Sequence, residues 1–216
     1  MIYYIAYFFL KISSKIFSPL TVFGREGLPQ GEGFVIASNH VSNLDPFILG
    51  LASRRRLSYV TKDTLFRNKV LRFFLYRVDA FPIKRGESDF RAMRETLRRL
   101  KKGRAVVLFP EGTRQKGDVA RKVQEGIGFI AAKSAAAVVP AYIEGSQRVL
   151  APGTKTLRRS PVTVIFGQPL RFTEGESYTE IASQVMERIF SLAPTETQTE
   201  TQEVQCSLFQ SIDEPE

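Results

Sequence analysis

Short apolar runs alternate with amphipathic segments along most of this chain, and this alternation restricts the possible folds more than any other feature. The apolar runs predict strands at 33–38, 57–60, 78–83, 105–109, 138–143 and 161–166. The segments between them predict helices at 46–52, 64–76, 88–102, 127–135 and 178–192. Strands and helices in alternation are typical of an α/β fold, with a largely parallel or mixed sheet flanked by helices. In such folds, functional sites lie in loops at the carboxyl ends of the strands.

The distribution of charge divides the chain into three parts. Residues 194–216 hold six of the 22 acidic residues and none of the 31 Lys and Arg residues. The rest of the chain therefore has 31 basic and 16 acidic residues, a net charge of +15, although the whole chain carries only +9. We expect a disordered acidic tail at 194–216, a folded domain at 25–193, and an apolar segment at 1–24. The basic surface favours a phosphate-bearing partner, either nucleic acid or anionic lipid.

The apolar N-terminal segment favours the lipid. Its first ten residues, MIYYIAYFFL, carry no charge. Such a run is too short to cross a bilayer, which takes about 20 residues, and it lacks the basic start and cleavage site of a signal peptide. Aromatic residues with lysines at the edges predict a helix lying in the membrane interface, and the alternative is a core helix. The Phe- and Arg-rich helix at 64–76 either adds to this lipid contact or is a buried helix with basic edges.

Metal and disulfide chemistry find little support. Cys206 is the one cysteine and lies in the polar tail, and His40 is the one histidine. A disulfide within one chain is therefore excluded, and a transition-metal site would need a set of carboxylates.

His40 lies in the loop SNHVSNLDP, five residues before Asp45. Imidazole is the side chain suited to act as a base near neutral pH, and a carboxylate bonded to its other nitrogen fixes the tautomer. Residues five apart on a regular helix point away from one another, so the pair requires an irregular turn. The alternative is that Asp45 caps the helix that begins with Pro46, and that His40 is an ordinary loop residue.

The hydroxyl on which such a base would act is not provided by the chain. There is no G-x-S-x-G motif, and Ser38 and Ser42 are ordinary loop residues. The hydroxyl would then belong to a substrate, which predicts transfer of a group onto an alcohol. Two further strand ends carry basic residues, Arg114 in PEGTR and Arg85 in FPIKRG. These residues would suit a phosphorylated alcohol, although Arg114 pairing with Glu111 in a tight turn is the simpler explanation of PEGTR.

Two motifs identify a family resemblance. The stretch NHVSNLD matches the Asn-His-x-x-x-x-Asp box of the glycerolipid acyltransferases, and FPEGTR matches their third box. The Arg85 segment lies between the boxes and VVPAYI (138–143) follows them, as in that family. From Phe34 to Phe166 the chain resembles the 1-acylglycerol-3-phosphate (lysophosphatidate) acyltransferases. The segments 78–85 and 123–126 depart from the usual second-box and post-box patterns, which leaves the acceptor open.

The resemblance implies a role for each matching residue. His40 is implied to be the base that deprotonates a glycerol hydroxyl, and Asp45 its orienting partner. The residues implied to bind the glycerol phosphate are Lys62, Arg85, Glu111, Gly112, Thr113 and Arg114. Pro140 lies in the fourth box, which has an acyl-donor or structural role.

The implied reaction moves an acyl group from acyl-CoA or acyl-carrier protein to lysophosphatidate, giving phosphatidate, with no metal or bound cofactor. The implied location is the cytoplasmic face of the cell's inner membrane, as a peripheral or monotopic protein with a lipid surface and no nucleic acid as partner. The alternatives are the same chemistry on another lysolipid or on glycerol 3-phosphate, and a non-enzymatic basic protein that binds membrane lipid.

Overall fold

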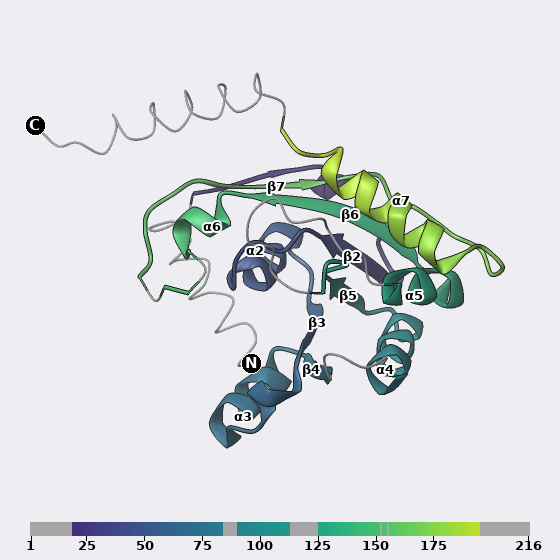
Figure 1. The fold of residues 1–216 in the computed structure, drawn as a ribbon, viewed down its shortest axis with the longest axis horizontal. Coiled ribbons are helices and arrows are strands. Elements are labelled where there is room, and N and C mark those ends of the chain that lie inside the picture. Colours follow the sequence, from purple (N-terminus) through teal and green to yellow (C-terminus); the bar gives the residue numbers. More distant parts are fainter. Residues whose placement is uncertain (1–18, 84–89, 113–124, 152, 155, 195–216) are drawn as a thin grey trace, which may run out of the picture.

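The structure is a computed structural model that describes residues 19–83, 90–112, 125–151, 153–154 and 156–194 (Figure 1). Within these ranges, seven strands form one sheet in the order β1-β7-β6-β2-β5-β3-β4. The strands are β1 (Leu20–Phe23), β2 (Phe34–Ser38), β3 (Leu57–Lys62), β4 (Ala80–Ile83), β5 (Ala105–Leu108), β6 (Ala137–Glu144) and β7 (Val162–Phe166). Neighbouring strands pair in parallel except β6 and β7, which are antiparallel. The predicted α/β class with a largely parallel sheet is therefore confirmed.

Helices cover both faces of this sheet (Figure 1). They are α2 (Asp45–Ser53), α3 (Lys69–Arg77), α4 (Phe90–Lys101), α5 (Gly126–Ser134), α6 (Ser146–Val149) and α7 (Tyr178–Phe190), with 3₁₀ turns η1 (Arg25–Gly27) and η2 (Asp63–Phe66). None of the described helices is long and apolar enough to cross a membrane.

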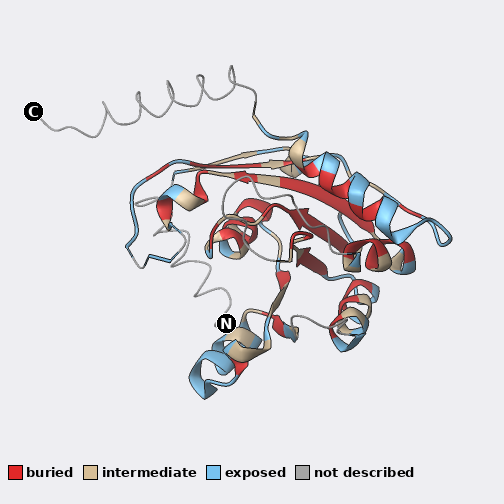
Figure 2. Ribbon diagram, in the orientation of Figure 1, coloured by how far each residue is buried: buried red, intermediate tan, exposed pale blue. Residues whose placement is uncertain are grey.

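The alternation of side chains in β2 separates two cores. Phe34 and Ile36 pack with α2 on one face, whereas Val35 and Ala37 pack with α4, α5 and α7 on the other. Successive residues of a strand point to opposite faces, so a strand covered on both sides must be apolar throughout. Every residue of β2 is buried, and Figure 2 shows the buried residues running along the central strands.

Two elements differ from the sequence-based expectation. The helix predicted at 64–76 is instead η2 followed by α3, because the Asn68 side chain accepts hydrogen bonds from the backbone N–H groups of Val70 and Leu71 and starts a new helix. Strand β1 lies in the part assigned to the membrane-associating segment. It pairs with β7, so the sheet begins before the expected boundary at residue 24. The predicted interface helix in residues 1–18 and the tail from residue 195 lie outside the described residues.

Candidate active site

Three neighbouring strands bring the candidate site together. Strand β2 lies between β5 and β6 and runs parallel to both, so the loops that follow these three strands emerge at one edge of the sheet. The His40 loop follows β2, the FPEGTR turn follows β5, and the turn into α6 follows β6. The site therefore lies at the carboxyl ends of the strands, where it was expected.

His40 and Asp45 are joined by a hydrogen bond. His40 Nδ1 lies 2.8 Å from Asp45 Oδ2. The same carboxylate oxygen accepts the backbone N–H groups of Val41, at 2.7 Å, and Ser42, at 2.8 Å. The chain turns tightly around this oxygen, which is how residues five apart meet. The helix-cap alternative does not describe Asp45: the N-cap position is Leu44, and the Asp45 side chain reaches back into the loop.

The hydrogen bonds of this pair indicate which imidazole nitrogen carries the proton. Asp45 is fully buried, and the His40 side chain is 12% exposed. A buried carboxylate that receives several N–H donors is held as an acceptor, and this network assigns the imidazole proton to Nδ1. Nε2 is then the nitrogen able to take a proton from a substrate.

Ser146 completes the surroundings of the Asp45 carboxylate. Its hydroxyl donates to Asp45 Oδ1 at 2.6 Å, and Ser146 is itself fully buried at the start of α6. Sequence reasoning missed this contact because 101 residues separate the two side chains. The Gly-Ser pair after β6 was the available signal, and nothing in it points to Asp45.

Asn39 anchors the His40 loop to β6. The Asn39 side chain donates to the Ile143 carbonyl at 2.9 Å and accepts the Ile143 N–H at 2.8 Å. Asn39 is only 3% exposed, so these bonds are shielded from water. Together with Ser146, the Asn39 amide fixes the position of the His40 loop relative to β6.

The turn after β5 supplies one wall of the site. The Phe109 ring stacks on the His40 imidazole, with centroids 4.1 Å apart and planes 18° from parallel. Gly112 has a φ of 68°, and its N–H donates to the Phe109 carbonyl at 2.9 Å, which closes the turn. Glu111, between them, is 4% exposed. The structure therefore brings the Asn-His-x-x-x-x-Asp box into contact with the start of the FPEGTR box.

The other predicted binding residues are less closely joined to this centre. Lys62 is exposed at the carboxyl end of β3, in register with Ile83, the last residue of β4. Pro140 is buried in β6 beside Ala37 and belongs to the sheet. The remaining three residues, Arg85, Thr113 and Arg114, lie outside the described residues. Among the described residues, no group of three His, Cys, Asp or Glu side chains is arranged to hold a metal ion.

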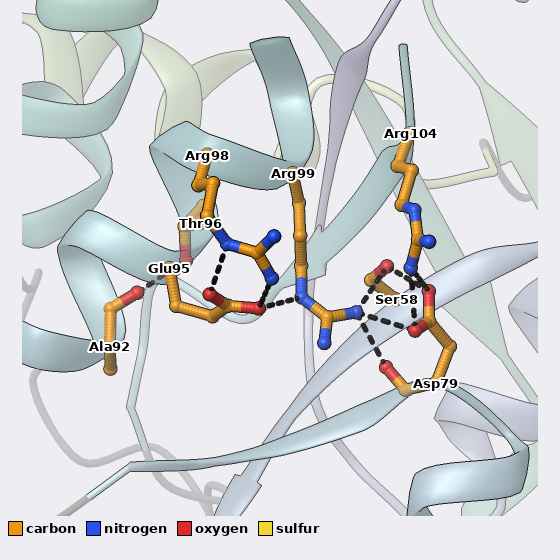
Figure 3. A network of polar contacts seen from close by, with 8 residues as sticks. All are labelled: Ser58, Asp79, Ala92, Glu95, Thr96, Arg98, Arg99 and Arg104. Carbon is orange, nitrogen blue, oxygen red and sulfur yellow. Dashed lines mark hydrogen bonds and ion pairs between the residues drawn. The ribbon is translucent and has the colours of Figure 1, made fainter. Parts of the chain in front are cut away.

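A second polar cluster lies at the opposite end of the sheet (Figure 3). Asp79, immediately before β4, forms an ion pair with Arg99 at 2.7 Å and with Arg104 at 2.8 Å, and it accepts the Ser58 hydroxyl. Glu95 binds Arg99 from the other side at 2.7 Å. Although Arg99 is a charged residue of α4, it is only 8% exposed. This cluster joins α4 to strands β3, β4 and β5 at their amino ends and is separate from the His40 site.

The charges of this cluster lower the pKa of its carboxyl groups. Burial raises the pKa of Asp79, but hydrogen bonds from Ser58 and Arg99, with the charges of Arg99 and Arg104, outweigh burial and hold it below its usual value. The hydrogen bond from Arg98 has the largest influence on Glu95 and, with Arg99, lowers the Glu95 pKa to about 2.

An imidazole held by a buried carboxylate at the carboxyl ends of parallel strands is an arrangement suited to a general base in an α/β enzyme. Comparison with known proteins specifies the class, because the acyltransferase family model matches residues 19–144. The chain belongs to this acyltransferase family.

Individual relatives agree with this assignment. The chain is 32% identical to the 1-acyl-sn-glycerol-3-phosphate acyltransferase of Bacillus subtilis, over 74% of this chain and 78% of that protein. It is 29% identical to the chloroplastic enzyme of that name, LPAT1, from Arabidopsis thaliana, over 81% of this chain and half of that protein. The solved structure of PlsC, the 1-acyl-sn-glycerophosphate acyltransferase of Thermotoga maritima, has the same fold, with a TM-score of 0.72 and 24% identity over 85% of this chain and 74% of that one.

We expect Ser146→Ala to lower kcat about tenfold, because the Asp45 carboxylate loses the hydrogen bond that the Ser146 hydroxyl donates to Oδ1. Steady-state kinetics of acyl transfer would measure the change. The control is Ser53→Ala, which removes another buried hydroxyl, at the end of α2, and should leave kcat unchanged. Wild-type kcat in a folded Ser146→Ala protein would show that Asp45 needs no support from α6.

Proposed function

We propose that this protein transfers a fatty acyl group from acyl-CoA or acyl-carrier protein to the free hydroxyl of 1-acylglycerol 3-phosphate, giving phosphatidate. The observation that carries the proposal is the hydrogen bond of 2.8 Å between His40 Nδ1 and the fully buried Asp45. With Nδ1 bound to Asp45, Nε2 is the imidazole nitrogen that can take a proton. The names of the relatives supply the acceptor.

The chemistry follows from the position of the proton. His40 Nε2 takes the proton of the acceptor hydroxyl while the hydroxyl oxygen attacks the thioester carbonyl carbon. Asp45 stabilises the imidazolium that forms. The carbon–sulfur bond then breaks, and the thiolate leaves with the proton returned by His40. The products are an ester and a free thiol, and the step balances without a metal or a bound cofactor.

The remaining parts of the site have roles in binding. The ring of Phe109 lies against one face of the imidazole and limits its rotation. We assign the glycerol phosphate to Glu111 and Gly112, together with Lys62 and the residues Arg85, Thr113 and Arg114. Positioning the hydroxyl beside a fixed base supplies much of the rate in such reactions.

The acceptor and the product are lipids, so the enzyme would work at a membrane surface, on the cytoplasmic face of the inner membrane. The apolar N-terminal segment would hold it there. Outside the tail, the chain has 31 basic and 16 acidic residues, and this excess of positive charge favours binding to an anionic leaflet.

Release of thiol from the acyl donor tests the proposal. The purified chain is incubated with acyl-CoA or acyl-carrier protein, with lysophosphatidate, with glycerol 3-phosphate, or with no acceptor. Release that requires lysophosphatidate and matches the phosphatidate formed supports the proposal. Release only with glycerol 3-phosphate would assign the other acceptor, and no release in any combination would favour a non-enzymatic lipid-binding protein.

A further inference from the structure

Helix α3 is the least buried helix in the part of the chain that the structure describes. It has no buried residue, whereas α2, α4, α5, α6 and α7 each bury part of their length. It stands out from the molecule beside β3 and β4 (Figures 1 and 2). A surface helix of a folded domain normally hides its apolar residues against the core. Most of the apolar residues of α3 are instead exposed.

These apolar residues form one patch. Val70 is 67% exposed, Leu71 39% and Phe74 51%. At 3.6 residues per turn the three side chains fall within about 100° of the helix surface, which makes a continuous strip. Phe73, at 47% exposed, and Tyr76, at 57%, extend the apolar surface beside it. Isolated exposed apolar residues are ordinary, but a contiguous group on one helix marks an interaction surface.

The charge of α3 indicates what it contacts. The helix carries Lys69, Arg72 and Arg77, all exposed, and its sequence KVLRFFLYR holds no acidic residue. Arg77 also lies over the Phe73 ring, 4.4 Å from its centroid. An apolar strip combined with basic residues that have long flexible stems is the composition of a helix lying in an anionic lipid surface.

The charges disfavour two other occupants. A second copy docked through the same patch would place its own Lys69, Arg72 and Arg77 against these cations. The apolar N-terminal residues carry Lys11 and Lys15 and no acidic residue, so they do not complement the patch either. An anionic bilayer satisfies both the apolar strip and the cations.

The place of α3 relative to the site suits this contact. The turn η2, which leads into α3, leaves β3 directly after Lys62, at the carboxyl end of the strand. The His40 loop and the Phe109 turn project from the same edge of the sheet. A bilayer that receives α3 therefore lies near the edge where the base is held.

We infer that α3 is a docking helix through which the folded domain binds the surface of an anionic bilayer, with Val70, Leu71 and Phe74 entering the lipid interface. This inference extends the proposed function. Its test measures binding, so it can succeed or fail independently of catalysis.

Two variants of the full-length chain test the inference. Val70→Ser/Leu71→Ser/Phe74→Ser removes the strip, and Lys69→Gln/Arg72→Gln removes two cations. Binding is measured by co-sedimentation with vesicles of equimolar phosphatidylcholine and phosphatidylglycerol, and with vesicles of phosphatidylcholine alone. The matched controls are Leu157→Ser, which removes an exposed apolar residue, and Lys101→Gln/Lys102→Gln, which neutralises two exposed cations at the end of α4.

We expect the strip variant to bind both kinds of vesicle at least about tenfold more weakly. The charge variant should bind the anionic vesicles about thirtyfold more weakly and the neutral vesicles as wild type does. Both controls should bind like wild type, and all variants should keep the wild-type unfolding temperature, since each changed side chain is exposed. Wild-type vesicle binding by both α3 variants would overturn the inference. If that result came with a change from dimer to monomer, α3 would be a contact between two copies.

Discussion

Asp45→Asn is expected to lower kcat by about 10²- to 10⁴-fold while leaving the fold in place. The amide oxygen can still accept the N–H groups of Val41 and Ser42, and the amide NH₂ can donate to the Ser146 hydroxyl. The side chain no longer carries the negative charge that stabilises the His40 imidazolium. Steady-state kinetics of thiol release would measure the loss, and thermal unfolding would confirm the fold.

Asp45→Ala provides the contrast. This change leaves the buried donors of Ser42, Ser146 and the His40 imidazole without their acceptor, and each unsatisfied group costs about 1–3 kcal/mol. We therefore expect Asp45→Ala to unfold at a clearly lower temperature, unlike Asp45→Asn. Wild-type kcat in Asp45→Asn would show that the carboxylate only organises the loop.

Asp79→Ala should lower the free energy of unfolding by about 3 kcal/mol without a direct effect on the site. The buried Arg99 would lose the Asp79 carboxylate at 2.7 Å and keep the Glu95 carboxylate, the Ser58 hydroxyl and the backbone carbonyl of residue 79 as partners. For a domain of this size, the unfolding temperature should fall by about 6–12 °C. Asp79 also has a φ of 65°, where alanine is strained, so Asp79→Asn separates the loss of charge from the backbone effect.

The control for this prediction is an exposed ion pair. Glu174 pairs with Lys133 on the surface, with the Glu174 side chain 73% exposed. Glu174→Ala should leave the unfolding temperature nearly unchanged, because water already solvates both groups. Equal losses in Asp79→Ala and Glu174→Ala would contradict a structural role for the buried cluster.

The same cluster gives stability a dependence on acid pH. The pKa of Asp79 is lowered from 3.8, and that of Glu95 from 4.5 to about 2. A carboxyl group with a depressed pKa in the folded state stabilises the fold fully above its unfolded pKa, and this contribution is lost as pH falls towards the folded pKa. The unfolding temperature should therefore decline from about pH 4.5 downwards, and this decline should be shallower in Asp79→Ala.

Sequence patterns located most of the sheet because its central strands are apolar on both sides. Strand β1 was missed because its residues, LTVF, follow a long apolar segment, and their hydrophobicity was attributed to lipid contact. Its partner, β7, lies more than 130 residues away, and a pairing at that distance leaves no local pattern. The break at Asn68 was missed because the apolar pattern continues across it and only the side-chain cap reveals the boundary.

The candidate site was predicted only in part, for a related reason. Spacing alone did not decide whether His40 and Asp45 form a pair. Their contact depends on an irregular turn, and no periodicity in the sequence indicates such a turn. Family resemblance pointed to the pair. The hydrogen bonds that hold this pair in place were not predictable. Asn39 binds Ile143 in β6, and Ser146 in α6 binds Asp45. Each contact joins residues more than 100 positions apart, so it becomes visible only in the folded structure.

The proposed role of His40 as the base in acyl transfer can be tested by comparing two variants with the wild type. Acceptor-dependent release of thiol from acyl-CoA is measured for wild type, His40→Ala and His40→Gln, with folding and vesicle binding checked for each. The Gln side chain keeps a donor for Asp45 but has no nitrogen that can take a proton. We predict that both variants remain folded and membrane-bound and lose at least about 10²-fold in kcat. Undiminished release by a folded His40→Gln protein would contradict the account and leave His40 as a structural residue of its loop.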